Sequence, residues 1–145
     1  MKRFIGCMYA CTAVLLTILA CGPLSQPESC GDYGGVANED LFNDVFESMG
    51  LFYATTGAPG EAGPEGEIRF DPNDELEITF ESKTDVSIRA CLEERKGGGK
   101  ILFNETESFP AGVHSFTLGT YSKGGYVVRM ILDETLVKNL PFRIE

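Results

Sequence analysis

The sequence predicts a mainly β protein: an antiparallel β-sandwich of about seven strands, preceded by one amphipathic helix and a flexible N-terminal tether. Apolar and polar residues alternate over short segments in the second half of the chain. Clusters rich in Gly, Pro, Asp and Asn separate these segments, as turns do between the strands of a sandwich. Without a leader and tether, roughly 110 residues remain, enough for one domain with its own core.

The chain starts with a short basic segment followed by an apolar one. Lys2 and Arg3 precede a run from Phe4 to Ala20 that carries no charge. This order is typical of a secretory signal peptide. A retained transmembrane helix is the alternative, but it needs about 20 predominantly apolar residues, and Gly22-Pro23 ends the run early. We therefore expect residues 1–20 to be a signal that is removed.

The apolar run ends in the four residues Ile18-Leu19-Ala20-Cys21. They resemble the lipobox of bacterial lipoproteins, in which a branched apolar residue lies three places before an invariant cysteine. The resemblance implies that Cys21 receives a diacylglyceryl thioether and becomes the acylated first residue of the mature protein, with fatty chains such as palmitate. Within that family, Gly22 in place of Asp implies the outer membrane. Ordinary signal cleavage nearby, which leaves a free secreted protein, is the alternative.

Residues 21–37 are expected to form a flexible tether, because Pro, Ser and Gly are frequent and no apolar period occurs. Processing would leave three cysteines, at positions 21, 30 and 91. With Cys21 lipidated, Cys30 and Cys91 form an even pair in an oxidising compartment, which favours a disulfide over two free thiols. Cys91 shares its predicted strand face with Arg89 and Glu93, so we expect it to point outward, within reach of the tether.

Residues 38–56 are predicted to form the amphipathic helix. Asn38 is a candidate N-cap, and Glu39 and Asp40 suit the positive end of a helix. The polar face is acidic, which is the wrong sign for a membrane surface, so packing on the sheet is favoured over binding to a membrane or partner. Residues 57–66, with Gly at every third place, are expected to form an exposed loop. Apolar residues recur at helical steps at Leu41, Phe42, Val45, Phe46, Met49, Phe52 and Tyr53.

The sandwich is expected to occupy residues 67–145, where the period of the pattern becomes two. Segment 126–132 is apolar at nearly every position, which indicates a central strand. Pro141 marks the last strand as an edge strand, because proline cannot donate to a ladder. The alternation is clearest near residues 75–81, 86–93, 101–103, 116–118, 126–132 and 140–144.

Two stretches, Gly112-Val113-His114-Ser115-Phe116-Thr117-Leu118 and Gly125-Tyr126-Val127-Val128-Arg129, resemble the end of bacterial immunoglobulin-like and fibronectin-III-like domains. In those domains a Gly-x-Tyr-type start opens the penultimate strand, and a final hairpin follows. The resemblance implies an immunoglobulin-like sandwich, an architecture that many unrelated functions share. The chain has no Trp, and Cys91 is alone within the sandwich, which excludes a core disulfide of the antibody type.

No catalytic or metal-binding pattern occurs in the sequence. His114 is the only histidine, and Gly-x-Ser-x-Gly is absent. The oxygen-rich stretch 71–75 is the best candidate for Ca²⁺, but Leu76 replaces the EF-hand Gly, which favours a turn. Gly97-Gly98-Gly99-Lys100 lacks the Ser or Thr of a phosphate loop and predicts a hairpin. We therefore expect no catalytic residue, no metal and no cofactor.

The mature chain would carry a net charge of −12, because the signal holds two of the 12 basic residues and none of the 22 acidic ones. Such a surface repels nucleic-acid phosphate and anionic headgroups, so we expect no nucleic-acid partner and no lipid contact beyond the anchor.

These observations favour a non-enzymatic, lipid-anchored envelope protein whose sandwich binds another envelope protein. A module that binds a small molecule or glycan in the strand-end loops is the alternative, and an enzyme is least supported. An aromatic-lined pocket at one end of the sandwich would favour the alternative. A flat exposed apolar patch would favour the protein-binding module.

Overall fold

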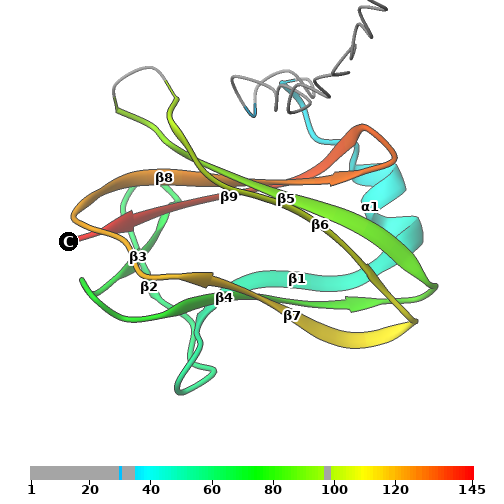
Figure 1. The fold of residues 1–145 in the computed structure, drawn as a ribbon, viewed down its shortest axis with the longest axis horizontal. Coiled ribbons are helices and arrows are strands. Elements are labelled where there is room, and N and C mark those ends of the chain that lie inside the picture. The colour runs from blue at the N-terminus through cyan, green and yellow to red at the C-terminus, as the bar shows by residue number, and fades with distance from the viewer. Residues whose placement is uncertain (1–29, 31–34, 97–98) are drawn as a thin grey trace, which may run out of the picture.

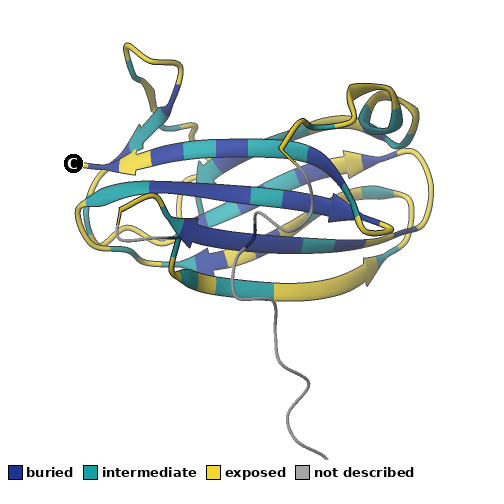
Figure 2. Ribbon diagram, turned by 90° about the horizontal axis from the view of Figure 1, so that it is seen from above, coloured by how far each residue is buried: buried dark blue, intermediate teal, exposed yellow. Residues whose placement is uncertain are grey.

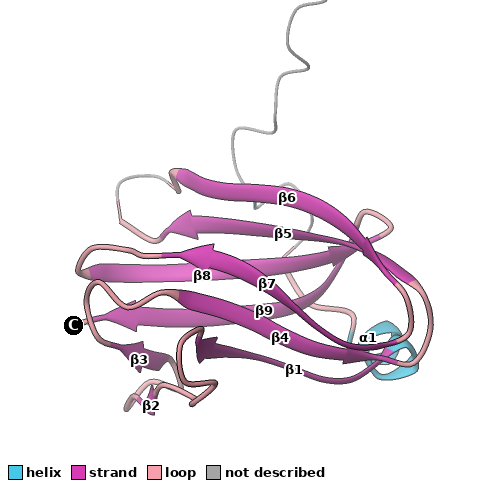
Figure 3. Cartoon of the chain, turned by 60° about the horizontal axis from the view of Figure 1, so that its bottom comes forward, coloured by secondary structure: helices cyan, strands magenta, loops and turns pink. Residues whose placement is uncertain are grey.

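The computed structural model describes residue 30 and residues 35–96 and 99–145, and the statements below concern this part of the chain. It confirms a mainly β sandwich of two sheets (Figure 1). One sheet has three strands in the order β1-β4-β7, and the other has six in the order β2-β3-β9-β8-β5-β6. All pairs are antiparallel except β3 with β9, which are parallel. Figure 3 shows the three-stranded sheet in front of the six-stranded one.

The elements follow one another along the chain as one short helix and then nine strands in the described part. They are α1 (Glu39–Val45), β1 (Phe46–Tyr53), β2 (Glu61–Ala62), β3 (Ile68–Phe70), β4 (Leu76–Ser82), β5 (Val86–Glu94), β6 (Ile101–Phe109), β7 (Gly112–Gly119), β8 (Gly124–Leu132) and β9 (Thr135–Ile144).

The segment predicted as one helix over 38–56 is helical only at its start. Helix α1 begins after Asn38, whose Oδ1 accepts the Leu41 N–H at 3.0 Å, as expected of an N-cap. The helix ends at Val45, and the next eight residues form β1, which pairs with β4. The helix prediction is therefore wrong for Phe46–Tyr53, where side chains alternate between the core and the outer face of the sheet.

The core lies between the two sheets and is built around aromatic rings. Phe80 of β4 is fully buried, and its ring centroid lies 5.9 Å from that of Phe46 and 5.2 Å from that of Phe109. Val128 of β8 is also fully buried, on the facing sheet. Figure 2 shows the buried residues concentrated in the strands and the exposed ones in the connecting loops and at the margins.

The two predictions about strand position have different outcomes. Strand β8 lies between β9 and β5, which confirms the central strand predicted for residues 126–132. Strand β9 is not an edge strand, because β3 pairs with its last three residues. Pro141 precedes Phe142, the first residue that faces β3, so its missing N–H removes no bond to that short strand.

The loop predicted over residues 57–66 is mostly exposed but contains β2, which pairs with β3. Gly60 holds this segment close to the sheet. A Cβ atom at Gly60 would lie 2.4 Å from the Arg69 carbonyl oxygen, so only glycine fits there. The extended sheet therefore starts earlier in the chain than the sequence indicated.

Within the described residues, no helix has the length and apolar character that crossing a membrane requires.

Candidate functional site

A disulfide joins Cys30 to Cys91 across 61 residues of chain, with the two Cα atoms 5.8 Å apart. Cys91 lies on β5 and points away from the sandwich core, on the same face as Arg89 and Glu93, as the alternating pattern predicted. It is nevertheless fully buried, because Cys30 covers it from outside. The bridge therefore attaches the N-terminal segment to the outer face of the six-stranded sheet.

A second, small apolar cluster surrounds the bridge on this outer face. It contains Cys30, Cys91, Ile131 and Leu136, with Ala37 and Ile101 packed at its margin. The chain returns to the sheet before α1, where the Asn38 N–H donates to the Leu136 carbonyl at 2.8 Å. The segment that precedes the helix is thus fixed to the sheet at two points, by a covalent bond and by a backbone hydrogen bond.

The Glu93 carboxylate completes this attachment. It is 9% exposed, and its Oε2 accepts the backbone N–H of Cys30 at 3.1 Å. Its Oε1 lies 3.1 Å from Nη2 of Arg129, whose Nη1 donates to Asn139 at 3.3 Å. A buried carboxylate needs such partners, because desolvation disfavours its charge. Sequence reasoning missed this role, because it depends on the pairing of β5 with β8, which places Glu93 and Arg129 on neighbouring strands.

The residues that carry the proposed anchor lie outside the described residues. This applies to the signal 1–20, to Cys21 and to most of the tether 21–37. The structure describes Cys30 and residues 35–37 of the tether, of which Cys30 and Ala37 pack against the sheet.

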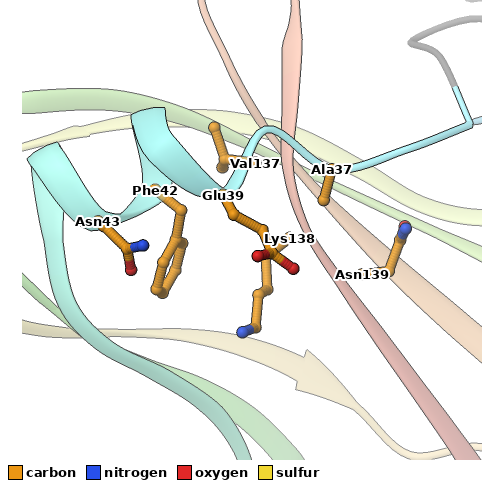
Figure 4. Close-up of a pocket in the computed structure, with 7 residues that line it drawn as sticks. All are labelled: Ala37, Glu39, Phe42, Asn43, Val137, Lys138 and Asn139. Atoms are coloured by element: carbon orange, nitrogen blue, oxygen red, sulfur yellow. The ribbon is translucent and has the colours of Figure 1, made fainter.

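A hollow of about 440 Å³ lies between α1 and β9 (Figure 4). Phe42 is its aromatic residue, and the Lys138 Nζ lies 4.6 Å from the centre of that ring, a cation–π arrangement. Glu39, Asn43 and Asn139 supply polar groups, as Figure 4 shows. One ring already covered by a lysine is not the aromatic-lined pocket that would identify a glycan site.

Exposed large apolar side chains are scattered in the described part of the chain. They are Val36, which is 90% exposed, Leu102 on β6 and Val113 on β7. Val36 precedes α1, and the other two lie on strands of different sheets, so they do not make the broad flat patch that would identify a protein interface. Val113 is 66% exposed on β7, an edge strand of the three-stranded sheet.

His114 lies near the start of β7 and packs among aromatic rings. It is half-buried, its ring centroid lies 5.0 Å from that of Phe109, and its Nε2 is 2.8 Å from the Pro110 carbonyl oxygen. Residues 71–75 form the turn between β3 and β4, and Asn73 takes a positive φ of 71° there. Across the residues that the structure describes, no group of three His, Cys, Asp or Glu side chains could hold a metal ion.

No protein-family profile matches the chain, and no curated sequence matches it.

Proposed function

We propose that the mature chain is a lipoprotein of the bacterial cell envelope, anchored through Cys21, and that its sandwich is a non-enzymatic interaction module. The observation that carries this proposal is the Cys30–Cys91 disulfide. Such bonds form and persist in exported, oxidising compartments and are rare in the cytosol. The lipobox-like residues Ile18–Cys21 supply the anchor, with the outer membrane as its destination.

We infer that the sandwich is immunoglobulin-like. Strands β1, β4 and β7 take the places of A, B and E, while β5, β8 and β9 take those of C, F and G. The Tyr126 hydroxyl, near the start of β8, donates to the Ser122 carbonyl oxygen at 2.6 Å. A tyrosine bonded back to the backbone at this corner is a hallmark of such sandwiches. The strand order and this bond support the inference together.

The proposed partner contact is the edge of β7. On the other exposed edge, β6 carries Glu105 and Glu107 at positions opposite Ala90 and Ile88, which face the core. Inward-pointing charges of this kind oppose the addition of another strand. Strand β7 instead places Phe116 and Leu118 on the core side and Val113, with small polar residues, on the other. A β7 edge of this composition can accept an extended segment of another envelope protein.

The hollow beside α1 supports the second candidate, a module that binds a small molecule or glycan. Polar groups of Glu39, Asn43 and Asn139 line it together with the Phe42 ring. A ligand there would have to displace Lys138 from that ring, which makes this candidate the weaker of the two.

Site-specific photocrosslinking in the native cells tests the partner proposal. A photoreactive residue replaces Val113 on β7 in one variant and exposed Thr106 on β6 in the matched control. We expect the Val113 probe to capture one envelope protein that the Thr106 probe does not. Capture from both positions alike, or from neither, would contradict a contact at β7.

A further inference from the structure

Basic residues gather at one end of the six-stranded sheet, where β5 ends, β8 begins and β9 ends. We call this group the basic end. All of its members are exposed: Arg95, Lys96, Lys100, Lys123 and Arg143. They come from the β5–β6 connection, the β7–β8 loop and the end of β9, which are distant in sequence. Half of the ten basic residues that follow position 20 are therefore concentrated in one place.

Contacts hold these residues close together. The Arg95 backbone N–H donates to the Gly125 carbonyl at 2.8 Å, which joins the β5–β6 connection to the start of β8. Lys96, Lys123 and Arg143 line one shallow hollow of about 210 Å³. The acidic residues beside them include Glu94, Glu145 and Glu67, which interacts electrostatically with Arg143. Glu145 lies 3.8 Å from Arg143 and 3.1 Å from Arg69. The five cations outnumber these three carboxylate side chains.

The outer face of the three-stranded sheet carries the opposite charge. Glu77 and Glu81 alternate with core residues along β4, so they lie on the outer face of the three-stranded sheet. Glu47 on β1 adds a third carboxylate, which Lys83 partly balances at 3.6 Å. Figure 1 shows this sheet on the side of the sandwich away from β5, β8 and β9. The negative net charge of the chain is therefore unevenly distributed.

The basic end also lies near the attachment of the N-terminal segment. Cys30 is bonded to the outer face of β5, the strand that leads directly into Arg95. Cys30 follows Cys21 by nine positions in the sequence. Even a fully extended chain of this length spans at most about 30 Å. A lipid on Cys21 would therefore keep the outer face of the six-stranded sheet close to the bilayer.

We propose that the basic end is a docking surface for the anionic phospholipid headgroups of the membrane that holds Cys21. The inference rests on the proposed lipid anchor and adds an orientation to it. Charges act on a bilayer surface only within about a Debye length, roughly 8 Å at physiological salt. The local excess of cations, and not the net charge of the chain, therefore governs the contact with the membrane. In this orientation the acidic three-stranded sheet, with β7 at its edge, faces away from the membrane and toward the partner. The exclusion of lipid contact that the net charge suggested does not hold for this end.

Lysine reactivity on vesicles tests this orientation with the wild-type protein. The mature lipidated protein is inserted into preformed vesicles of phosphatidylcholine, alone or mixed with phosphatidylglycerol. A water-soluble reagent then acetylates the lysines, and mass spectrometry follows each rate. On the anionic vesicles we expect Lys96, Lys100 and Lys123 to react about fivefold more slowly, the factor that corresponds to one basic residue held at an anionic surface.

Lys83, which pairs with Glu47 of the three-stranded sheet, is the internal control and should react at the same rate on both vesicles. Salt near 1 M, where the Debye length is about 3 Å, should remove the slowing. Equal rates on both vesicles would overturn the proposal, as would slowing that appears only when acidic envelope proteins are added. Failure of the purified protein to float with either vesicle would instead contradict the lipid anchor itself.

Discussion

The carboxylate of Glu93 accepts a hydrogen bond from the backbone N–H of Cys30, which is 63 residues away in the chain. The same Cys30 forms the disulfide with Cys91, and the same carboxylate forms the ion pair with Arg129. Cys30 is therefore held against the folded domain by both contacts. If Cys21 carries the proposed anchor, this attachment determines which face of the domain lies toward the membrane.

Replacement of Glu93 by alanine should destabilise the domain. The side chains of Glu93 and Arg129 are 12% and 19% exposed, so removal of the carboxylate leaves a largely buried guanidinium without its ion-pair partner. We expect a loss of about 3 kcal/mol in the free energy of unfolding, the cost of breaking a buried pair. Chemical denaturation measures it, with Glu94→Ala as the matched control. Equal stability of the two variants would show that Glu93 has no such role.

Loss of the disulfide should cost more than loss of the ion pair. A bridge that closes 61 residues restricts the unfolded chain, and loop-closure entropy sets its contribution near 4 kcal/mol. We expect the double variant Cys30→Ala, Cys91→Ala to unfold at a correspondingly lower denaturant concentration. Alkylation of the unreduced mature protein should label neither cysteine. Two labelled thiols would contradict the bridge.

Truncation of Phe80 should leave a cavity in the aromatic core and destabilise the domain. Its ring is fully buried among Phe46, Phe109 and Phe116, so Phe80→Ala should cost about 3–5 kcal/mol. Val128→Asp should prevent folding, because the position opposite is also buried and offers no partner for a charge. Val113→Asp, on an exposed position, is the control. Native melting of both core variants would contradict the strand arrangement.

Stability should fall in alkaline solution because of Tyr121. Burial raises the pKa of its hydroxyl to about 12, and the neighbouring Tyr126 adds to the shift. In the unfolded chain the Tyr121 hydroxyl loses its proton near pH 10, whereas in the folded protein it keeps the proton up to about pH 12. Its contribution is therefore complete below pH 10 and lost as the pH rises toward 12. Denaturation experiments across this range should show that the free energy of unfolding declines more steeply for the wild type than for Tyr121→Phe. Parallel declines would argue against the contribution of Tyr121.

The sequence predicted the sandwich correctly and the end of the helix wrongly, for a reason visible in β1. Leu51 is 1% exposed and faces the core, yet it does not fit the helical spacing. Phe52 fits that spacing but lies on the other face, where its ring covers Gly50: a Cβ there would lie 3.0 Å from the Phe52 Cε2 atom. A bulge between Phe46 and Ser48 further hides the period of two. Pairing with β4 decides this segment, and no local pattern reveals it.

The disulfide was predictable because processing and lipidation of Cys21 would leave one pair of cysteines, Cys30 and Cys91. The alternation of residues along β5 also placed Cys91 on an outward face. The burial of that face was not predictable. It depends on the return of the chain to Leu136 and on the Glu93 contact with Cys30, both of which join distant segments. The grouping of basic residues at the basic end has the same cause, since three separate connections meet there.

The anchor is the central claim, and mass spectrometry of the mature protein purified from its native membranes tests it most directly. We expect the N-terminal peptide to begin at Cys21 and to carry a diacylglyceryl group with further acylation, and the Cys21→Ala variant to remain an unprocessed precursor. A first residue elsewhere, or a Cys21 without fatty chains, would contradict the account and the membrane orientation derived from it.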